Sequence, residues 1–340
     1  FMNLEEIARL SGVSRSTVSR VINHSPKVSP EVRERVMEVI RQTNFQPNIA
    51  ARSLAAASTH IIGLVIPTGV SRLFVDPYFP ILIQGISAAC NANELTLMMW
   101  LAEPEYEQRM IRQILYSGLI DGVVISSVLS TDPLVEALTV ANRPFVMIGR
   151  TASYIPVSYV DVDNVESACQ AIIYLSQQNR RRIATITGPL NTIVGIDRLQ
   201  GYHLAMKQLG KDVEPGLIAE GDFTRDGGYK AMNRLLIHHP DAVFVASDGM
   251  AEGAMNAIRD AGLHIPLDIA LVGFDDIPFS AHMDPPLTTV RQPIHRMGSM
   301  AVQVLMDIIN DPSSQPHIVK LPTELVVRAS SGLAVPAPPG

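Results

Sequence analysis

The sequence predicts an α/β protein with two doubly wound parallel-sheet lobes, preceded by a small all-α domain. From residue 61 onward, short apolar runs alternate with amphipathic helical segments, which is typical of parallel strands covered by helices on both faces. The alternation pauses at residues 157–163, an apolar run with no long helix before it, so we expect one sheet to give way to another there. The first sixty residues carry only helical patterns and short turns.

The first helix is predicted to begin at Leu4. Asn3 can accept an amide hydrogen bond at the helix start, and Glu6 can reach back to it, which is the arrangement of a capping box. Gly12 is expected to end this helix, because glycine adopts the left-handed conformation without a Cβ clash.

Two further helices follow in the small domain. The second begins after Ser14 and places Val18 and Val21 on one face. The third begins at Ser29 with Pro30 in its first position, where a proline is favoured. Its predicted buried face consists of Val32, Val36, Val39 and Ile40.

A helix, a turn that contains glycine and a second helix at this spacing form a helix-turn-helix pattern, in which the second helix enters the DNA major groove. With the valines turned inward, the outer face of the second helix offers Arg15, Ser16, Ser19 and Arg20. Arginine suits guanine because its two donors match the O6 and N7 acceptors. The alternative is a generic three-helix bundle with a solvated surface helix.

The distribution of charge agrees with DNA binding by the small domain alone. The whole chain carries a formal net charge of −6. Residues 1–60 hold eight Lys or Arg against five acids, a balance of +3, so the remaining residues carry −9. A basic module on an acidic body is expected where only the small module touches phosphate.

Residues 13–36 and 45–55 resemble the lactose/galactose repressor (LacI/GalR) family. Thr17 to Asn23 match its T-V-S-R-V-[IV]-N stretch, and Asn48 to Leu54 match its N-x-x-A-R-S-L hinge. The resemblance implies that Arg15, Ser16 and Arg20 read bases, and that the hinge folds on operator DNA with two symmetry-related copies of Leu54 wedged into a minor-groove step. The alternative for Leu54 is packing against the small domain. The candidate DNA-contacting residues are Ser14, Arg15, Ser16, Ser19, Arg20, Asn23, Ala51 and Leu54.

The predicted elements of the two lobes follow the alternation. Strands are expected at 61–67, 96–101, 122–126, 144–148, 157–163, 182–187, 243–247 and 269–274. Helices are expected at 79–91, 105–116, 166–178, 197–209, 228–238 and 250–261.

The resemblance extends to a type I periplasmic-binding-protein-like sensor, whose chain crosses between its lobes three times. We place the crossings near Val160, Val290 and Leu321. The expected domains are therefore a DNA-binding domain at 1–47, a hinge at 48–59, an N-terminal lobe at 60–160 and 291–321, a C-terminal lobe at 161–290 and 322–330, and a tail at 331–340.

An effector is expected in the cleft at the carboxyl ends of the strands. Tyr78 and Phe79 open the first helix of the N-terminal lobe and can stack on a ring, although Phe79 has a core aromatic as its alternative. Arg150 follows a strand, with a surface ion pair as its alternative.

The resemblance adds further candidate pocket residues. It implies that Arg198 forks onto ligand hydroxyls or a carboxylate and that Phe223 forms an aromatic edge. Ser247 and Asp248 occupy a position where sugar-binding relatives commonly carry Asn-Asp. Asp275, within a family G-[YF]-D-[DN] motif, is expected to accept hydrogen bonds from the ligand.

Several classes of protein are not expected. Asp275 and Asp276 are adjacent on an extended segment and should point to opposite faces, so we do not expect them to act as an acid–base pair. No common catalytic or phosphate-binding motif is present, and we expect no catalytic residues, no cofactor and no metal. Cys90 and Cys169 are expected to be buried, reduced thiols. With no apolar stretch long enough for a bilayer and no secretory pattern, we expect a cytoplasmic protein.

The sequence therefore predicts a DNA-binding transcriptional repressor that is not an enzyme. We expect a homodimer that binds a pseudo-palindromic double-stranded operator and responds to a carbohydrate-like effector between the lobes. The Pro- and Ala-rich end after residue 329 lacks the heptads of a tetramer-forming coiled coil. The alternatives are a nucleobase- or nucleoside-responsive regulator, a solute-binding protein, and an enzyme fused to a helix-turn-helix domain.

Overall fold

The chain folds into two compact units, residues 1–60 and residues 61–340. The computed structural model describes residues 2–22, 25–45, 58–66, 73, 75–101, 107–116, 118–126, 133–152 and 156–332. Within these ranges, no helix has both the length and the apolar character needed to span a membrane.

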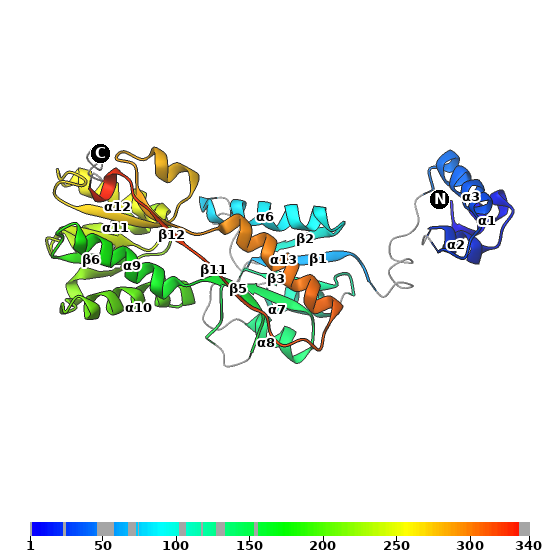
Figure 1. The fold of residues 1–340 in the computed structure, drawn as a ribbon, viewed down its shortest axis with the longest axis horizontal. Coiled ribbons are helices and arrows are strands. Elements are labelled where there is room, and N and C mark those ends of the chain that lie inside the picture. Colours follow the sequence, from blue (N-terminus) through cyan, green and yellow to red (C-terminus); the bar gives the residue numbers. More distant parts are fainter. Residues whose placement is uncertain are drawn as a thin grey trace, which may run out of the picture. The chain divides into compact units, whose positions relative to one another are not determined.

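The first unit is a bundle of three helices, α1 (Leu4–Ser11), α2 (Arg15–Ile22) and α3 (Pro30–Thr43), as predicted (Figure 1). Its core consists of Ile7, Ala8, Val18, Val21, Val36 and Phe45. Of the residues predicted to be buried on α3, only Val36 is fully buried, while the others pack around this core. Because this core is small, the contacts that fix the helix ends contribute to the stability of the unit.

The ends of α1 are fixed by the residues that the sequence indicated. The Asn3 side chain accepts hydrogen bonds from the backbone N–H groups of Glu5 and Glu6, and the Glu6 carboxylate accepts from the Asn3 N–H at 3.0 Å. Gly12 ends the helix with a φ of 64°, in the left-handed region. The turn between α1 and α2 is therefore set by local backbone chemistry.

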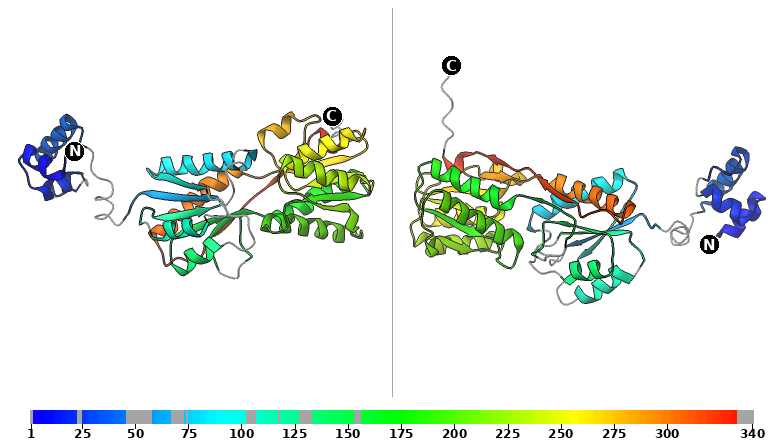
Figure 2. Two further views of the ribbon diagram at one scale, coloured as in Figure 1. Left: turned by 180° about the vertical axis from the view of Figure 1, so that it is seen from behind. Right: turned by 60° about the horizontal axis from the view of Figure 1, so that its bottom comes forward.

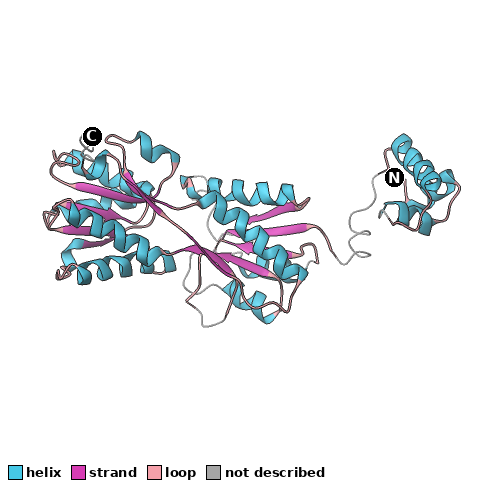
Figure 3. Ribbon diagram, in the orientation of Figure 1, coloured by secondary structure: helices cyan, strands magenta, loops and turns pink. Residues whose placement is uncertain are grey.

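The second unit contains two six-stranded sheets, which confirms the predicted fold class (Figure 3). The first sheet has the order β11-β5-β4-β3-β1-β2 and the second has the order β12-β10-β9-β8-β6-β7. The paired strands are parallel except β12, which runs antiparallel to β10. The first sheet comprises β1 (Ile61–Ile66), β2 (Thr96–Leu101), β3 (Gly122–Ile125), β4 (Phe145–Ile148), β5 (Tyr159–Val162) and β11 (Ile318–Leu321). The second comprises β6 (Ile183–Thr187), β7 (Ile218–Glu220), β8 (Ala242–Val245), β9 (Ala270–Asp275), β10 (Thr288–Arg291) and β12 (Glu324–Val326).

Helices cover both faces of each sheet (Figure 2). In the first lobe, α6 and α13 bury one face, and α7 and α8 bury the other. In the second lobe, α11 and α12 bury one face, and α9 and α10 bury the other. The helices of the first lobe are α6 (Tyr78–Ala92), α7 (Glu107–Tyr116), α8 (Pro133–Val140) and α13 (Ile294–Asn310). Those of the second lobe are α9 (Asn164–Gln177), α10 (Ile193–Gln208), α11 (Arg225–Leu236) and α12 (Asp248–Asp260).

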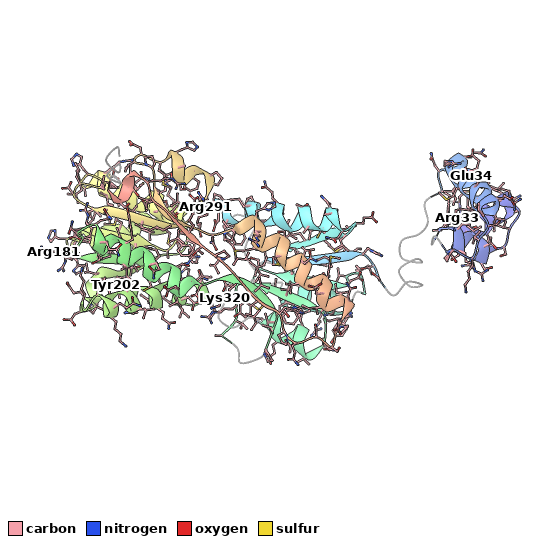
Figure 4. The ribbon with its side chains drawn as sticks, viewed as in Figure 1. Arg33, Glu34, Arg181, Tyr202, Arg291 and Lys320 are labelled. Atoms are coloured by element: carbon pink, nitrogen blue, oxygen red, sulfur yellow. The ribbon has the colours of Figure 1, made fainter. Side chains whose placement is uncertain are left out.

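The chain passes between the two sheets after β5, after β10 and after β11. Ion pairs tie these passages together, and Figure 4 labels Lys320 and Arg291, one on each of two passages. Lys320 donates to Asp163 at 2.9 Å, which joins β11 to the start of α9. Arg291 lies 3.1 Å from Glu324, which joins β10 to β12. These ion pairs thus join the three passages to one another.

Some elements differ from the sequence prediction. The helix predicted at 197–209 begins at Ile193, because the Thr192 side chain caps it by accepting from the Gly195 N–H at 3.1 Å. The prediction omitted α8 and α13, and also the strands β7, β10, β11 and β12. These strands contain three or four residues each, which is too short for a clear period-two pattern.

Candidate functional site

The first candidate site is the outer face of α2 in the three-helix unit. Ser14, Arg15, Ser16 and Arg20 are exposed, and Ser19 is half-buried, while Val18 and Val21 are buried beneath them. Of the other candidates for contacting DNA, Asn23, Ala51 and Leu54 lie outside the described residues. The described part therefore presents one polar, basic helix face on an apolar base.

Local contacts hold this face in place and leave its arginines available. The Ser14 hydroxyl accepts from the Thr17 N–H at 3.2 Å and caps α2. Arg15 lies 3.6 Å from Glu5, and both side chains are well exposed, so this pair contributes at most about 1 kcal/mol and yields readily to a phosphate or a base. Arg33 on α3 donates to the Ser25 carbonyl at 2.6 Å and anchors the chain beyond α2.

The second candidate site is a cavity in the second unit, lined by residues from both lobes. Its empty space is about 640 Å³ when the open solvent at its mouth is included, of which about 70 Å³ is open to the centre of a water molecule. The first lobe contributes Asp76, Tyr78, Phe79, Ser126, Ile148, Gly149, Asp161 and Met297. The second lobe and the passages contribute Asn164, Val194, Arg198, Phe223, Ser247, Asp275 and Gln292.

The cavity lies at the carboxyl ends of strands in both sheets. Ser126 follows β3 and Gly149 follows β4, while Asp275 is the last residue of β9. In open α/β sheets, ligands bind outside these ends because the loops diverge there. The structure therefore brings Tyr78, Phe79, Arg198, Phe223, Ser247 and Asp275, six of the predicted pocket residues, to one cavity.

Arg198 is the centre of the polar network in the cavity wall. Its side chain is only 5% exposed, and its Nε donates to Asn164 Oδ1 at 3.0 Å. One terminal nitrogen donates to the Ala246 carbonyl and lies 3.7 Å from Asp275 Oδ1. The guanidinium carbon lies 3.5 Å from the centroid of the Phe274 ring. Burial lowers the pKa of Arg198, but the nearby carboxylates favour its charged form.

Asp275 faces Arg198 from the end of β9. Burial raises the pKa of Asp275 to about 7, although Arg198 opposes the shift. Its Oδ1 accepts a hydrogen bond from Gln292 Nε2 at 2.5 Å, and Gln292 is on the passage that leaves β10. A ligand in the cavity thus meets a carboxyl group whose charged form is disfavoured by burial and favoured by Arg198.

The backbone at the end of β9 directs the two acids apart. Asp275 has a φ of 123° and Asp276 has a φ of 55°, both in the region that L-residues rarely adopt. Asp276 accepts hydrogen bonds at 2.6 Å from both Arg291 and Arg328, which hold its pKa below the ordinary value despite burial. The two acids thus contact different partners, but the reason differs from the predicted one, because Asp275 and Asp276 have positive φ values at the end of β9 instead of extended strand geometry.

Two predicted pocket residues do not line the cavity. Arg150 forms a two-hydrogen-bond ion pair with the buried Asp197 carboxylate of α10, which joins the two lobes. The ion-pair alternative for Arg150 is thus the one observed, although the pair is partly buried. Asp248 is fully buried behind the wall, where it accepts from Thr289 Oγ1 at 2.6 Å and from the Ile277 N–H at 3.0 Å.

Aromatic side chains occupy separate parts of the lining. The Tyr78 and Phe79 rings form an edge-to-face pair with centroids 5.5 Å apart. Phe79 is also part of the first-lobe core, so its core alternative and its pocket role both apply. Phe223 adopts a φ of 64°, and its ring lies so close to Gly188 that a Cβ there would be 2.2 Å from it. A glycine at 188 is thus required for this ring position.

The sequence prediction missed several polar lining residues, above all Asp161, Asn164 and Gln292. All three lie in or beside the passages between the sheets. Asp161 Oδ1 accepts from Asn164 Nδ2 at 3.1 Å and from the Val162 N–H at 2.8 Å. Burial raises the pKa of Asp161 to about 6. A signal for Asp161 was available, since it is a charged residue within an apolar run.

The described residues contain no group of three or more His, Cys, Asp or Glu side chains arranged to hold a metal ion. Cys90 and Cys169 are buried free thiols. Burial raises the pKa of both thiols, which makes their reactive thiolate forms unfavourable.

Comparisons with known proteins match both units. Residues 3–48 match a family described as bacterial regulatory proteins, lacI family, and residues 172–331 match a periplasmic binding protein-like domain. The chain is 38% identical over 332 residues to the HTH-type transcriptional regulator CelR of Thermobifida fusca, covering 96% of this chain and 97% of that protein.

Two solved structures are similar over almost the whole chain. A complex of the transcriptional regulator CelR with cellobiose matches with a TM-score of 0.77 at 36% identity, covering 97% of this chain and 100% of that chain. A Lac repressor dimer bound to operator and the anti-inducer ONPF matches with a TM-score of 0.86 at 26% identity, covering 98% and 99%.

A helix-turn-helix unit joined to a two-lobed unit with an interior cavity defines a DNA-binding transcriptional regulator with a separate ligand-binding part. The extent of the similarity to CelR identifies the family. The chain belongs to the LacI family of bacterial regulatory proteins.

The raised pKa of Asp275 predicts a pH dependence of stability. The unfolded chain holds this proton with an ordinary pKa of 3.8 and the folded chain with a pKa of about 7, so protonation of Asp275 favours folding. That contribution is fully present below the unfolded pKa and is lost as the pH rises through about 7. Urea unfolding of the full chain without ligand should therefore show a larger loss of stability from pH 5 to pH 8 in the wild type than in Asp275→Asn. Asp311→Asn, an exposed control, should retain the wild-type loss. Equal losses in wild type and Asp275→Asn would contradict the assignment.

Proposed function

We propose that this regulator is a dimeric repressor whose affinity for a pseudo-palindromic operator is controlled by a saccharide bound in the interlobe cavity. The observation that carries the proposal is the composition of the cavity wall. It combines hydrogen-bonding groups of Arg198, Asn164, Asp161 and Asp275 with aromatic faces, and polyols require both. The similarity to a CelR–cellobiose complex supports a saccharide in particular.

The repressor and dimer parts of the proposal rest on the DNA-binding unit and its relatives. A Lac repressor dimer on its operator is similar to nearly the entire chain. Two copies of one helix-turn-helix unit related by a two-fold axis read a pseudo-palindrome. In this proposal, Arg15, Ser16 and Arg20 contact base edges from α2, while Ser14 and Ser19 support its position. Further contacts with the operator come from Asn23, Ala51 and Leu54, which lie outside the described ranges.

We propose that the cavity binds its ligand without transforming it. Asp275 is engaged by Arg198 and Gln292, and Asp161 by Asn164 and a backbone N–H, so both acids act as parts of a fixed wall. General acid–base catalysis would require them to exchange protons with a substrate at a nearby reacting centre. Because the partner of the regulator is the cell's own DNA, we also propose that it acts in the cytoplasm.

DNA reading by α2 is tested by removing one arginine. Arg20→Ala should lose sequence-specific binding by at least about fivefold, because a good arginine–base contact is worth about 1–3 kcal/mol. A duplex selected from a random library with the wild-type protein serves as the probe in gel shifts. Arg35→Ala removes an equally exposed arginine from α3 and should bind the same duplex with little change. If Arg20→Ala bound the duplex as tightly as the wild type does, the outer face of α2 would not be the face that reads the DNA bases.

Saccharide binding is tested by calorimetry with cellobiose, ribose, glucose and adenosine. A saccharide should bind and adenosine should not. Arg198→Lys should weaken the binding by at least about 10-fold, because it keeps the buried charge but removes the planar donor set. Arg225→Lys, in an exposed pair with Glu252 outside the cavity, should bind as the wild type does. Adenosine as the only binder would favour the nucleoside-responsive alternative, and unchanged affinity in Arg198→Lys would remove Arg198 from the site.

A further inference from the structure

The cavity has an unequal set of charges. Among its lining residues, Asp76, Asp161 and Asp275 are acidic and Arg198 alone is basic. Two more buried carboxyls lie behind the wall. Asp197 is paired with Arg150, and burial raises the pKa of Asp248 well above its ordinary value, which disfavours its charged form. At neutral pH, the carboxylate of Asp161, whose pKa is about 6, therefore gives the described part of the wall a negative potential.

The one basic lining residue does not offset this potential for an incoming ligand. Arg198 is held by Asp275 at 3.7 Å and by the Asn164 and Ala246 oxygens, and its face covers Phe274. Its positive charge is thus already matched by a buried carboxylate within the wall. Within the described residues, its second terminal nitrogen has no hydrogen-bond partner, so one donor is left for a ligand hydroxyl.

Asp161 lies on the first lobe, on β5, whereas Arg198 belongs to α10 of the second lobe. Asp161 is only 3% exposed, and it lines the cavity. Both of its hydrogen bonds, from Val162 N–H and Asn164 Nδ2, go to Oδ1. In the part of the chain that the structure describes, no donor reaches Oδ2, which is left as an acceptor for a ligand.

We propose that the cavity takes uncharged saccharides and excludes anionic ones, such as sugar phosphates and uronic acids, and that Asp161 sets this selectivity. The inference rests on the proposed function, because it concerns the same cavity. A neutral sugar hydroxyl donates to Oδ2 and gains a charge-assisted hydrogen bond. A phosphate or carboxylate at the same place has no proton to donate and meets a like charge.

The size of the effect follows from Coulomb's law. Two like charges about 6 Å apart repel strongly even at the effective dielectric of about 20 that suits protein sites. Screening by salt is weak for groups that are buried. An anionic saccharide should therefore bind at least about 10-fold more weakly than its neutral counterpart.

The experiment compares two nearly isosteric ligands by calorimetry on the full chain. Cellobiose is the neutral probe, and cellobiouronic acid, which carries a carboxylate in place of one hydroxymethyl group, is the anionic probe. The wild type should prefer cellobiose by at least about 10-fold. Asp161→Asn should bind cellobiose several-fold more weakly and should narrow the preference to about threefold or less, because the amide accepts and donates without a charge.

Asp163→Asn is the matched control. It removes the same charge two residues along the chain, where the side chain pairs with Lys320 and does not line the cavity. Asp163→Asn should prefer cellobiose over cellobiouronic acid by the same factor as the wild type. Should Asp161→Asn fail to fold, Asp76→Asn, which removes a second lining carboxylate, must narrow the preference in the same direction.

The outcomes separate this inference from the proposed function. Binding of cellobiose and cellobiouronic acid with equal affinity to the wild type would overturn the selectivity and leave saccharide binding intact. A wild-type preference that persists in Asp161→Asn would overturn the assignment to Asp161. Binding of neither probe, nor of any other saccharide, would overturn both proposals.

Discussion

The burial of one guanidinium, that of Arg198, is the constraint on which the ligand-binding cavity depends. A buried charge is costly unless it is paired and hydrogen-bonded, and removing one partner of such a pair costs about 3–5 kcal/mol. The chain meets this requirement with groups from several elements: a carboxylate from the end of β9, an amide oxygen from the start of α9, a carbonyl after β8 and an aromatic face beneath. Two of these residues, Asp275 and Asn164, also line the cavity, so a ligand there meets residues that satisfy Arg198.

The short segment from Gly273 to Asp276 illustrates how closely this network is built. Gly273 must lack a side chain, because a Cβ would lie 2.4 Å from the buried Asp248 carboxylate. Phe274 lies under the guanidinium, and Asp275 pairs with it. Asp276 turns away to Arg291 and Arg328, which belong to the passages between the lobes and to the last strand region. Four consecutive residues thus join the second sheet, the cavity wall and the interlobe passages.

The sequence was sufficient for elements with local signals. The capping box of Asn3 and Glu6, the glycine stop at Gly12 and the continuous apolar runs of β1 and β3 require only neighbours along the chain. It was sufficient for Arg198 and Asp275 because they lie in motifs that resemble a known family. It was insufficient where a role depends on two lobes meeting: Asp161 and Gln292 have no motif, and the ion pair that removes Arg150 from the cavity needs a partner 47 residues away. Helix α13 was also missed, and it packs in the first lobe although it follows five of the six strands of the second sheet.

In the proposed function, a saccharide in the cavity and an operator on α2 act on the same equilibrium between lobe arrangements. Thermodynamic linkage then requires reciprocity: the factor by which a saccharide changes operator affinity equals the factor by which the operator changes saccharide affinity. The most direct measurement is operator affinity by fluorescence anisotropy with and without saturating cellobiose, paired with cellobiose affinity with and without saturating operator. We expect a change in affinity of at least about fivefold, with the same factor in both directions. Cellobiose that binds tightly and leaves operator affinity unchanged would contradict it.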